Sequence, residues 1–302
     1  MRRDSDRALT SASGRISFGR MDDQTSAATD LTLDQFLTAI RSAAARLHDH
    51  VKQAGLDAAV PTCPDWDVRA LVTHQGMVHR WAAANVRGDF DHRTAESEAA
   101  AAAAPDLLAW FDEGTQVLIE TLIQAAADLE TMVFLSNAPA PRLFWARRQA
   151  HETTIHSVDA QAAELGRLPG PAETMIDQEL AADGIDELLR GFLPRRKSRL
   201  RFESPYVIDV HATDADRHWQ VAVSDQPPFS VRGTTTGCRD HRHGPRAVFG
   251  IVESRRGPQG RGTRRRARAV APPGTRALVG TMKIRESPRL ACGQAARRSS
   301  KP

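Results

Sequence analysis

The segment from Arg147 to His156 combines guanidinium, imidazole and carboxylate groups at helical spacing, and reads RRQAHETTIH. The zinc-protease pattern HExxH is excluded, because the residue four positions after His151 is Ile155. Glu152 and His156 are also four residues apart, about 40° around a helix, so both side chains can reach one metal ion. His151 and His156 are five residues apart, differ by roughly 140°, and cannot readily share an ion. The sequence therefore offers one carboxylate and one imidazole as a ligand pair.

A third ligand has to come from another element, because two ligands from one helix hold a divalent ion weakly. An earlier helical segment offers His74 and His79, which both fall on its apolar arc with Leu71, Val78 and Trp81. An isolated histidine there is commonly a core residue. A carboxylate and an imidazole displayed together on a neighbouring helix, however, would be costly to bury without a counter-charge. Two histidines and a glutamate around an open position form a known catalytic zinc arrangement. Periodicity alone does not decide between His74 and His79.

Four helices are expected to position these groups. The first spans residues 31–55, with Thr32 and Gln35 as a capping box and Gly55 as its stop. The loop PTCPDWD follows, and its two prolines exclude a continuous helix. Asp67 then caps a second helix that runs to about Gly88.

The third helix is predicted from about Pro105 to Ala127 and the fourth from Pro141 to just before Gly166. Residues 89–104 are a connector or a helix lead-in. Such helices predict an up-and-down bundle. Glu152 and His156 are expected at the bundle wall, beside an apolar stripe of Phe144, Ile155, Val158 and Ala162.

The remaining chain predicts a smaller α+β part. A helical stretch with a break at Gly184 precedes three strand-like runs, SRLRFES, YVIDVHAT and HWQVAVSD. The predicted fold class is α+β, with a disordered extension at residues 1–28, a four-helix bundle at 29–166 and a partial α+β domain at 167–232. Because Met21 opens a more ordinary N-terminus, a mis-assigned start codon is plausible.

Charge is distributed unevenly along the chain. Residues 1–230 carry 34 acidic and 23 basic side chains, whereas residues 231–302 carry 3 acidic and 18 basic ones. The Arg/Gly/Pro-rich tail, residues 233–302, is either a disordered basic tail or a frameshifted terminus, and we favour the frameshift. Nucleic-acid binding is disfavoured because Phe249 is the one aromatic residue among the arginines.

Several classes of protein are excluded by composition. No apolar stretch approaches the ~18 residues of a membrane span, so no membrane partner is expected. The three cysteines are widely spaced and odd in number, which argues against a disulfide framework. We expect a cytoplasmic protein. The oligomeric state is left open.

Three motifs in order resemble one family. VPTCPDWDVRALVTHQGMVHRW, ARRQAHETTIHSVDAQ and LAADGIDELL are similar to segments of the mycothiol-dependent maleylpyruvate isomerase family, over about residues 31–230. The resemblance implies a DinB-like bundle whose metal ligands are His74, Glu152 and His156, with His79 outside the set. The sequence departs from the family pattern after the last predicted strands, where the Arg/Gly/Pro-rich tail stands in place of the family's apolar helix.

The resemblance also implies a reaction. A divalent metal, expected to be Zn²⁺, would hold the thiol of mycothiol as a thiolate. The sulfur would add to the cis double bond of maleylpyruvate, permit rotation and leave, or a related member would transfer the thiol to an electrophile. The partners are then a small-molecule substrate and mycothiol. The alternative is a non-catalytic DinB-like metal-binding or interaction protein.

Other polar or reactive residues receive less specific interpretations. Arg147 and Arg148 are interpreted as a solvated helix face rather than a substrate-carboxylate site. Asp159 either orients a ligand or is exposed. Cys63 is assigned a structural role, and Trp66 and Trp81 are assigned to the core. No catalytic residue beyond the metal ligands, and no mycothiol-binding residue, is identified.

Overall fold

The computed structural model describes residues 28–135 and 137–233, together with the backbone of 246–251. Contacts divide the chain into two units, Met1–Ala269 and Val270–Pro302, and all described residues belong to the first. The predicted extension (1–28) and tail (233–302) lie almost entirely outside the described residues, so both stay predictions.

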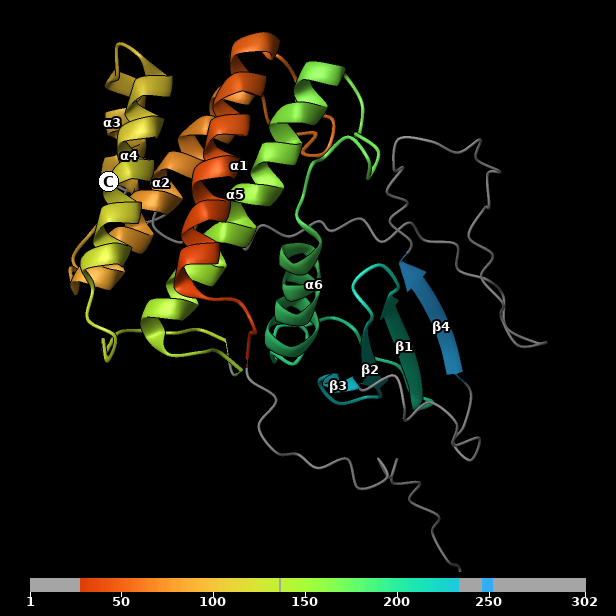
Figure 1. The fold of residues 1–302 in the computed structure, drawn as a ribbon. Coiled ribbons are helices and arrows are strands. Elements are labelled where there is room, and N and C mark those ends of the chain that lie inside the picture. The colour runs from red at the N-terminus through yellow and green to blue at the C-terminus, as the bar shows by residue number, and fades with distance from the viewer. Residues whose placement is uncertain (1–27, 136, 234–245, 252–302) are drawn as a thin grey trace, which may run out of the picture. The chain divides into compact units, whose positions relative to one another are not determined.

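Between residues 28 and 166, the described chain forms five α-helices: α1 (Leu33–Ala54), α2 (Val68–Arg87), α3 (Thr94–Ala103), α4 (Leu107–Gln124) and α5 (Pro141–Leu165). Helix α1 lies along α5, and α2 lies along α4 and also contacts α5 (Figure 1). The four long helices match the four predicted ones. No helix in the described ranges is long and apolar enough to cross a membrane.

The helix ends follow from local side-chain chemistry. Thr32 and Gln35 form the predicted capping box at the start of α1. Asp67 accepts a 2.7 Å hydrogen bond from the backbone N–H of Ala70 at the start of α2. Gly88 and Gly166 end α2 and α5 in the left-handed conformation that glycine adopts without strain. These ends fix which residues of α2 and α5 can face each other.

Two apolar clusters fill the helical part. One centres on Phe36, Leu118 and Trp145, the other on Leu47, Leu71 and Phe111.

Residues 89–104, predicted as a connector or a helix lead-in, contain helix α3, which contacts α2.

The predicted apolar stripe of α5 is wrong at Ile155, whose surface is 48% exposed. Helix α5 instead buries polar residues, among them Arg147, His151 and His156. A stripe counted from apolar residues alone cannot detect such a polar buried face.

The C-terminal part begins with α6 (Gln178–Asp186), which continues into a π-helical turn, η1 (Glu187–Phe192). The predicted break at Gly184 is therefore wrong. Gly184 serves close packing instead, since a Cβ atom there would lie 3.2 Å from His151 Nδ1.

A small antiparallel sheet follows, built from β1 (Tyr206–Ala212), β2 (Arg217–Val223) and β3 (Phe229–Gly233). The backbone of β4 (Arg246–Ile251) pairs parallel with β1, in a segment for which the sequence predicts no strand. Residues 198–204, SRLRFES, are not a strand, although Phe202 donates one backbone hydrogen bond to Ser224. The strand β3 was missed because it is short and follows two prolines. The fold is α+β, a mostly helical part followed by a small sheet.

Candidate metal centre

Three side chains that can ligate a metal converge between α2 and α5. His74 comes from α2, and Glu152 and His156 come from one face of α5. One ligand atom from each lies within 4.8 Å of the others. The structure thus brings together the three residues implied by the family resemblance.

The distances within this group leave room for an ion between the ligand atoms. Glu152 Oε1 lies 3.8 Å from His74 Nε2 and 3.4 Å from His156 Nε2. His74 Nε2 is buried, and no hydrogen-bond partner is found for it in the described part of the chain. Because a buried polar atom without a partner is costly, this nitrogen fits the role of a metal ligand. Two imidazoles and one carboxylate are a donor set suited to Zn²⁺.

His156 is oriented by Asp159. Asp159 is buried, and its Oδ2 lies 2.9 Å from His156 Nδ1. A proton on Nδ1 donated to this carboxylate leaves the lone pair of Nε2 directed at the other ligands, as in carboxylate–histidine–zinc arrangements. Of the two interpretations open for Asp159, the structure supports orientation and not exposure.

Trp66 closes one side of the group. Its ring centroid lies 4.9 Å from that of His74 and 5.9 Å from that of His156. Trp66 also packs against the core cluster of Leu47 and Leu71, as predicted. Its contacts with the two histidine rings were not predicted.

Trp81 packs in the core, as predicted. Cys63 is partly buried, with its Sγ 3.9 Å from Asp159 Oδ2.

The charges of Glu152 and His156 are set by their neighbours. Burial raises the pKa of Glu152, but Arg148, His156 and His74 outweigh it and hold this pKa well below its usual value. Burial lowers the pKa of His156, but Asp159 and Glu152 outweigh it and raise this pKa to about 9. Without metal, the carboxylate is therefore ionised and the imidazole protonated near neutral pH.

His79 lies in a separate hydrogen-bonded core site. Its Nδ1 is 3.0 Å from Thr115 Oγ1, and its Nε2 is 2.9 Å from Thr153 Oγ1 and 2.8 Å from Gln75 Nε2. Burial, with a contribution from Arg80, lowers the pKa of His79 to about 3, so the ring is neutral. Both ring nitrogens of His79 have hydrogen-bonding neighbours, so of the two histidines of α2 it is His74 that belongs to the candidate metal-binding group.

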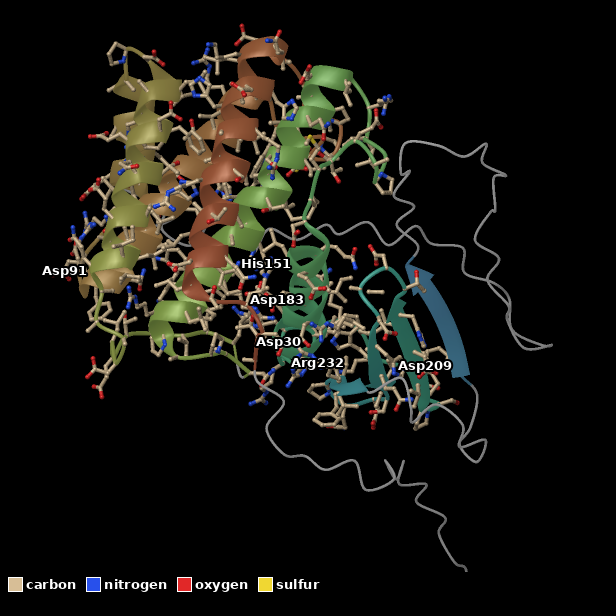
Figure 2. All side chains as sticks on the ribbon, viewed as in Figure 1. Asp30, Asp91, His151, Asp183, Asp209 and Arg232 are labelled. Atoms are coloured by element: carbon tan, nitrogen blue, oxygen red, sulfur yellow. The ribbon has the colours of Figure 1, made fainter. Side chains whose placement is uncertain are left out.

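The interpretation of Arg147 and Arg148 as a solvated face is wrong. Arg147 is 2% exposed and donates from Nε to Asp183 Oδ2 at 2.7 Å. His151 Nε2 lies 2.8 Å from the same Asp183 oxygen, so His151 belongs to this ion-pair cluster and not to the candidate metal-binding group (Figure 2). Arg148 contacts Glu152 and Glu187. The arginines pair with α6 and η1 instead of water.

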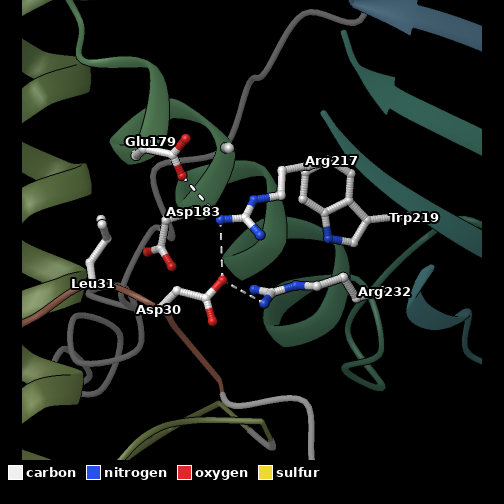
Figure 3. Close-up of a pocket in the computed structure, with 8 residues that line it drawn as sticks. Asp30, Leu31, Glu179, Asp183, Arg217, Trp219 and Arg232 are labelled. Carbon is white, nitrogen blue, oxygen red and sulfur yellow. Dashed lines mark hydrogen bonds and ion pairs between the residues drawn. The ribbon is translucent and has the colours of Figure 1, made fainter. Parts of the chain in front are cut away.

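A separate polar pocket lies beside α6 and the sheet, lined by Asp30, Leu31, Glu179, Ala182, Asp183, Arg217, Trp219 and Arg232 (Figure 3). Arg217 and Arg232 both contact Asp30 Oδ2, at 3.4 and 3.0 Å. The lining of this pocket includes none of the three residues of the candidate metal centre.

Sequence reasoning missed the part played by Arg148 and by the acidic residues of α6 and η1. A usable signal was present, because Asp183, Asp186 and Glu187 share one helix face at the i, i+3, i+4 spacing. Three carboxylates on one face need cations opposite them, and adjacent arginines on α5 supply them.

Comparison with known proteins places the helical part in a family. A family model described as the mycothiol maleylpyruvate isomerase N-terminal domain matches residues 6–161. Crystal structures of the mycothiol-dependent maleylpyruvate isomerase and of a histidine-to-alanine mutant are 14% identical in sequence to this chain, with TM-scores of 0.44 and 0.45. Each match covers 67% of this chain and 84% of the other. No curated protein matches significantly. The range matched by the family model contains His74, Glu152 and His156 and stops before α6.

Proposed function

Because the chain belongs to the mycothiol maleylpyruvate isomerase N-terminal domain family, we propose that it is a metal- and mycothiol-dependent enzyme, an isomerase or a related thiol transferase. The bundle is proposed to be DinB-like and up-and-down, with the site between its second and last helices. The observation that carries the proposal is the convergence of His74, Glu152 and His156, in which the buried Nε2 of His74 has no hydrogen-bond partner in the described structure.

Each residue of the site has a defined task. His74 and His156 present Nε2 atoms, and Asp159 holds the ring of His156 in the orientation that directs Nε2 at the ion. Glu152 offers Oε1, while its Oε2 accepts from Arg148. Trp66 shields the imidazoles on one side. Three protein ligands leave a fourth position open, as in catalytic zinc sites.

When bound, Zn²⁺ would supply an electrophilic centre that lowers the pKa of a thiol in the open position. In the proposed reaction, the thiolate sulfur of mycothiol would form a bond to one carbon of the cis double bond of maleylpyruvate, with the electron pair moving onto the conjugated carbonyl. Rotation about the resulting single bond and departure of the same thiolate would give the trans isomer. The thiolate would be regenerated, so the reaction would need no oxidant or reductant.

A turnover assay tests this proposal. Metal-loaded protein is mixed with mycothiol and maleylpyruvate, and product formation is followed with each component omitted in turn. We expect turnover that requires metal and thiol and that disappears in Glu152→Ala. His48→Gln is the matched control, since His48 pairs with Asp112 and is not one of the three ligands.

The assay also separates the alternative function. Metal-loaded protein that neither isomerises maleylpyruvate nor joins mycothiol to an electrophile would contradict the proposal. That result would favour a non-catalytic metal-binding or interaction protein.

A further inference from the structure

The side chain of Arg148 bridges two carboxylates from distant parts of the chain, the partly buried Glu152 and the buried Glu187. Its Nη2 donates to Glu152 Oε2 at 2.5 Å, and its Nη1 donates to Glu187 Oε2 in η1. Its guanidinium carbon also lies 5.3 Å from the centroid of the Phe192 ring, at the other end of η1. Arg148 is thus held on one side by the proposed metal centre and on the other by the π-helical turn.

The two oxygens of Glu152 have different partners. Oε2 accepts from Arg148, whereas Oε1 faces His74 Nε2 and His156 Nε2 at 3.8 and 3.4 Å. A carboxylate with one oxygen held by a charge-assisted hydrogen bond is fixed in rotation. It then offers a metal one oxygen and not two.

Glu187 is placed for this contact by the unusual helix that follows α6. The chain changes from α to π geometry at Glu187, and π-helical turns occur frequently at functional sites. Glu187 is 2% exposed, and its Oε1 has no hydrogen-bond partner in the described structure. Burying a carboxylate is costly unless a cation pairs with it. Arg148 is the cation that pairs with Glu187, and it pairs through one carboxylate oxygen.

We propose that Arg148 and Glu187 are positioning residues of the metal centre, which fix Glu152 as a ligand through a single oxygen. The inference rests on the proposed function, since it requires a metal at His74, Glu152 and His156. It extends that function in one respect: α6 and η1, which lie outside the residues matched by the family model, contribute to the site.

Single-oxygen ligation has a chemical consequence. If Glu152 bound through both oxygens, the three protein residues would supply four ligand atoms and fill the position that a thiol needs. With Arg148 holding Oε2, one position stays open. The Arg148–Glu187 pair would therefore keep a coordination position free for the thiol, in addition to strengthening metal binding.

The test compares Arg148→Met and Glu187→Gln with wild-type protein. Arg147→Lys is the matched control, because Arg147 is the adjacent buried arginine and its ion pairs are with Asp183 and Asp186. Each protein is titrated with Zn²⁺, and its Co²⁺ form is examined by visible absorption. Thermal unfolding of each variant shows that it is folded at the assay temperature.

We expect Arg148→Met and Glu187→Gln to bind Zn²⁺ about 10- to 100-fold more weakly, the range for loss of a residue that orients a ligand. The Co²⁺ absorption of Arg148→Met should weaken, because a released Glu152 adds a second oxygen and raises the coordination number. Arg147→Lys should keep the wild-type affinity and spectrum.

The outcomes separate this inference from the proposed function. Wild-type protein that binds no metal would overturn both. Wild-type protein that binds one ion, with unchanged affinity and Co²⁺ spectrum in folded Arg148→Met and Glu187→Gln, would overturn the inference alone. An equal loss of affinity in Arg147→Lys would also overturn it, since the effect would then come from a general loosening of the packing of α5 against α6 and η1.

Discussion

Breaking the buried ion pair of Arg147 should destabilise the fold by a large and measurable amount. Its Nε and Nη2 donate to Asp183 Oδ2 and Oδ1 at 2.7 and 3.2 Å, and Nη2 also donates to the Asp183 carbonyl at 2.9 Å. A further contact of 3.3 Å reaches Asp186 Oδ2. Substitution Arg147→Met keeps much of the side-chain volume and removes all four contacts.

The expected loss of unfolding free energy depends on the carboxylates that stay buried after the substitution. Removing one partner of a buried ion pair costs about 3–5 kcal/mol, because the other charge stays buried without compensation. Here Asp183 keeps His151, and Asp186 keeps Arg190, Arg232 and the indole N–H of Trp219. The remaining partners place the expected loss at the lower end, about 3 kcal/mol.

Urea unfolding of wild type and Arg147→Met, followed by circular dichroism, measures this difference. Arg167→Met is the control, since Arg167 pairs with Glu173 on the exposed surface and should give no measurable change. A loss of less than about 1 kcal/mol in Arg147→Met would refute the reasoning, because it would show that the pair is worth no more than a surface salt bridge.

Three other predictions concern the metal site and its surroundings. Asp159→Asn should weaken Zn²⁺ binding by about 10- to 100-fold in an equilibrium titration, and an unchanged affinity would show that Asp159 does not orient His156. Because the pKa of His156 is raised to about 9, Zn²⁺ binding at pH 7.5 should release about one proton from this ring. Calorimetry in buffers of different ionisation enthalpy measures that proton, and a heat independent of the buffer would contradict the prediction. For Asp183, burial raises the pKa, but His151 and Arg147 outweigh it and leave the pKa below its usual value. A lowered pKa in the folded state means that the ionised group stabilises the protein above about pH 4 and that this contribution is lost as the pH falls further. The difference in unfolding free energy between wild type and Asp183→Asn should therefore shrink between pH 7 and pH 3, and a constant difference would count against this assignment.

The parts of the fold that depend on local chemistry could be predicted from the sequence. Thr32 with Gln35, Asp67 and Pro141 mark helix starts through contacts within a few residues, and the structure places helices there. Glu152 and His156 share a face because four residues make about one helical turn. Local chemistry does not decide between His74 and His79 as the candidate ligand. That choice depends on which ring nitrogens already have hydrogen-bonding side chains of neighbouring helices beside them.

The errors share one physical cause, which is pairing over long distances in the sequence. Arg147 and Arg148 look like a solvated face until Asp183, Asp186 and Glu187, 36 to 39 residues later, are placed against them. Gly184 looks like a helix break, but it allows His151 to pack closely against α6. Neither local propensity nor hydrophobic periodicity contains such information.

Metal content of the purified protein tests the central claim most directly. Wild-type protein, Glu152→Ala and His48→Gln are dialysed against the same Zn²⁺ buffer and analysed by inductively coupled plasma mass spectrometry. If His74, Glu152 and His156 form the metal centre, wild type and His48→Gln will carry about one Zn²⁺ per chain and Glu152→Ala much less. Equal zinc in wild type and Glu152→Ala, or no zinc in folded wild type, would contradict it.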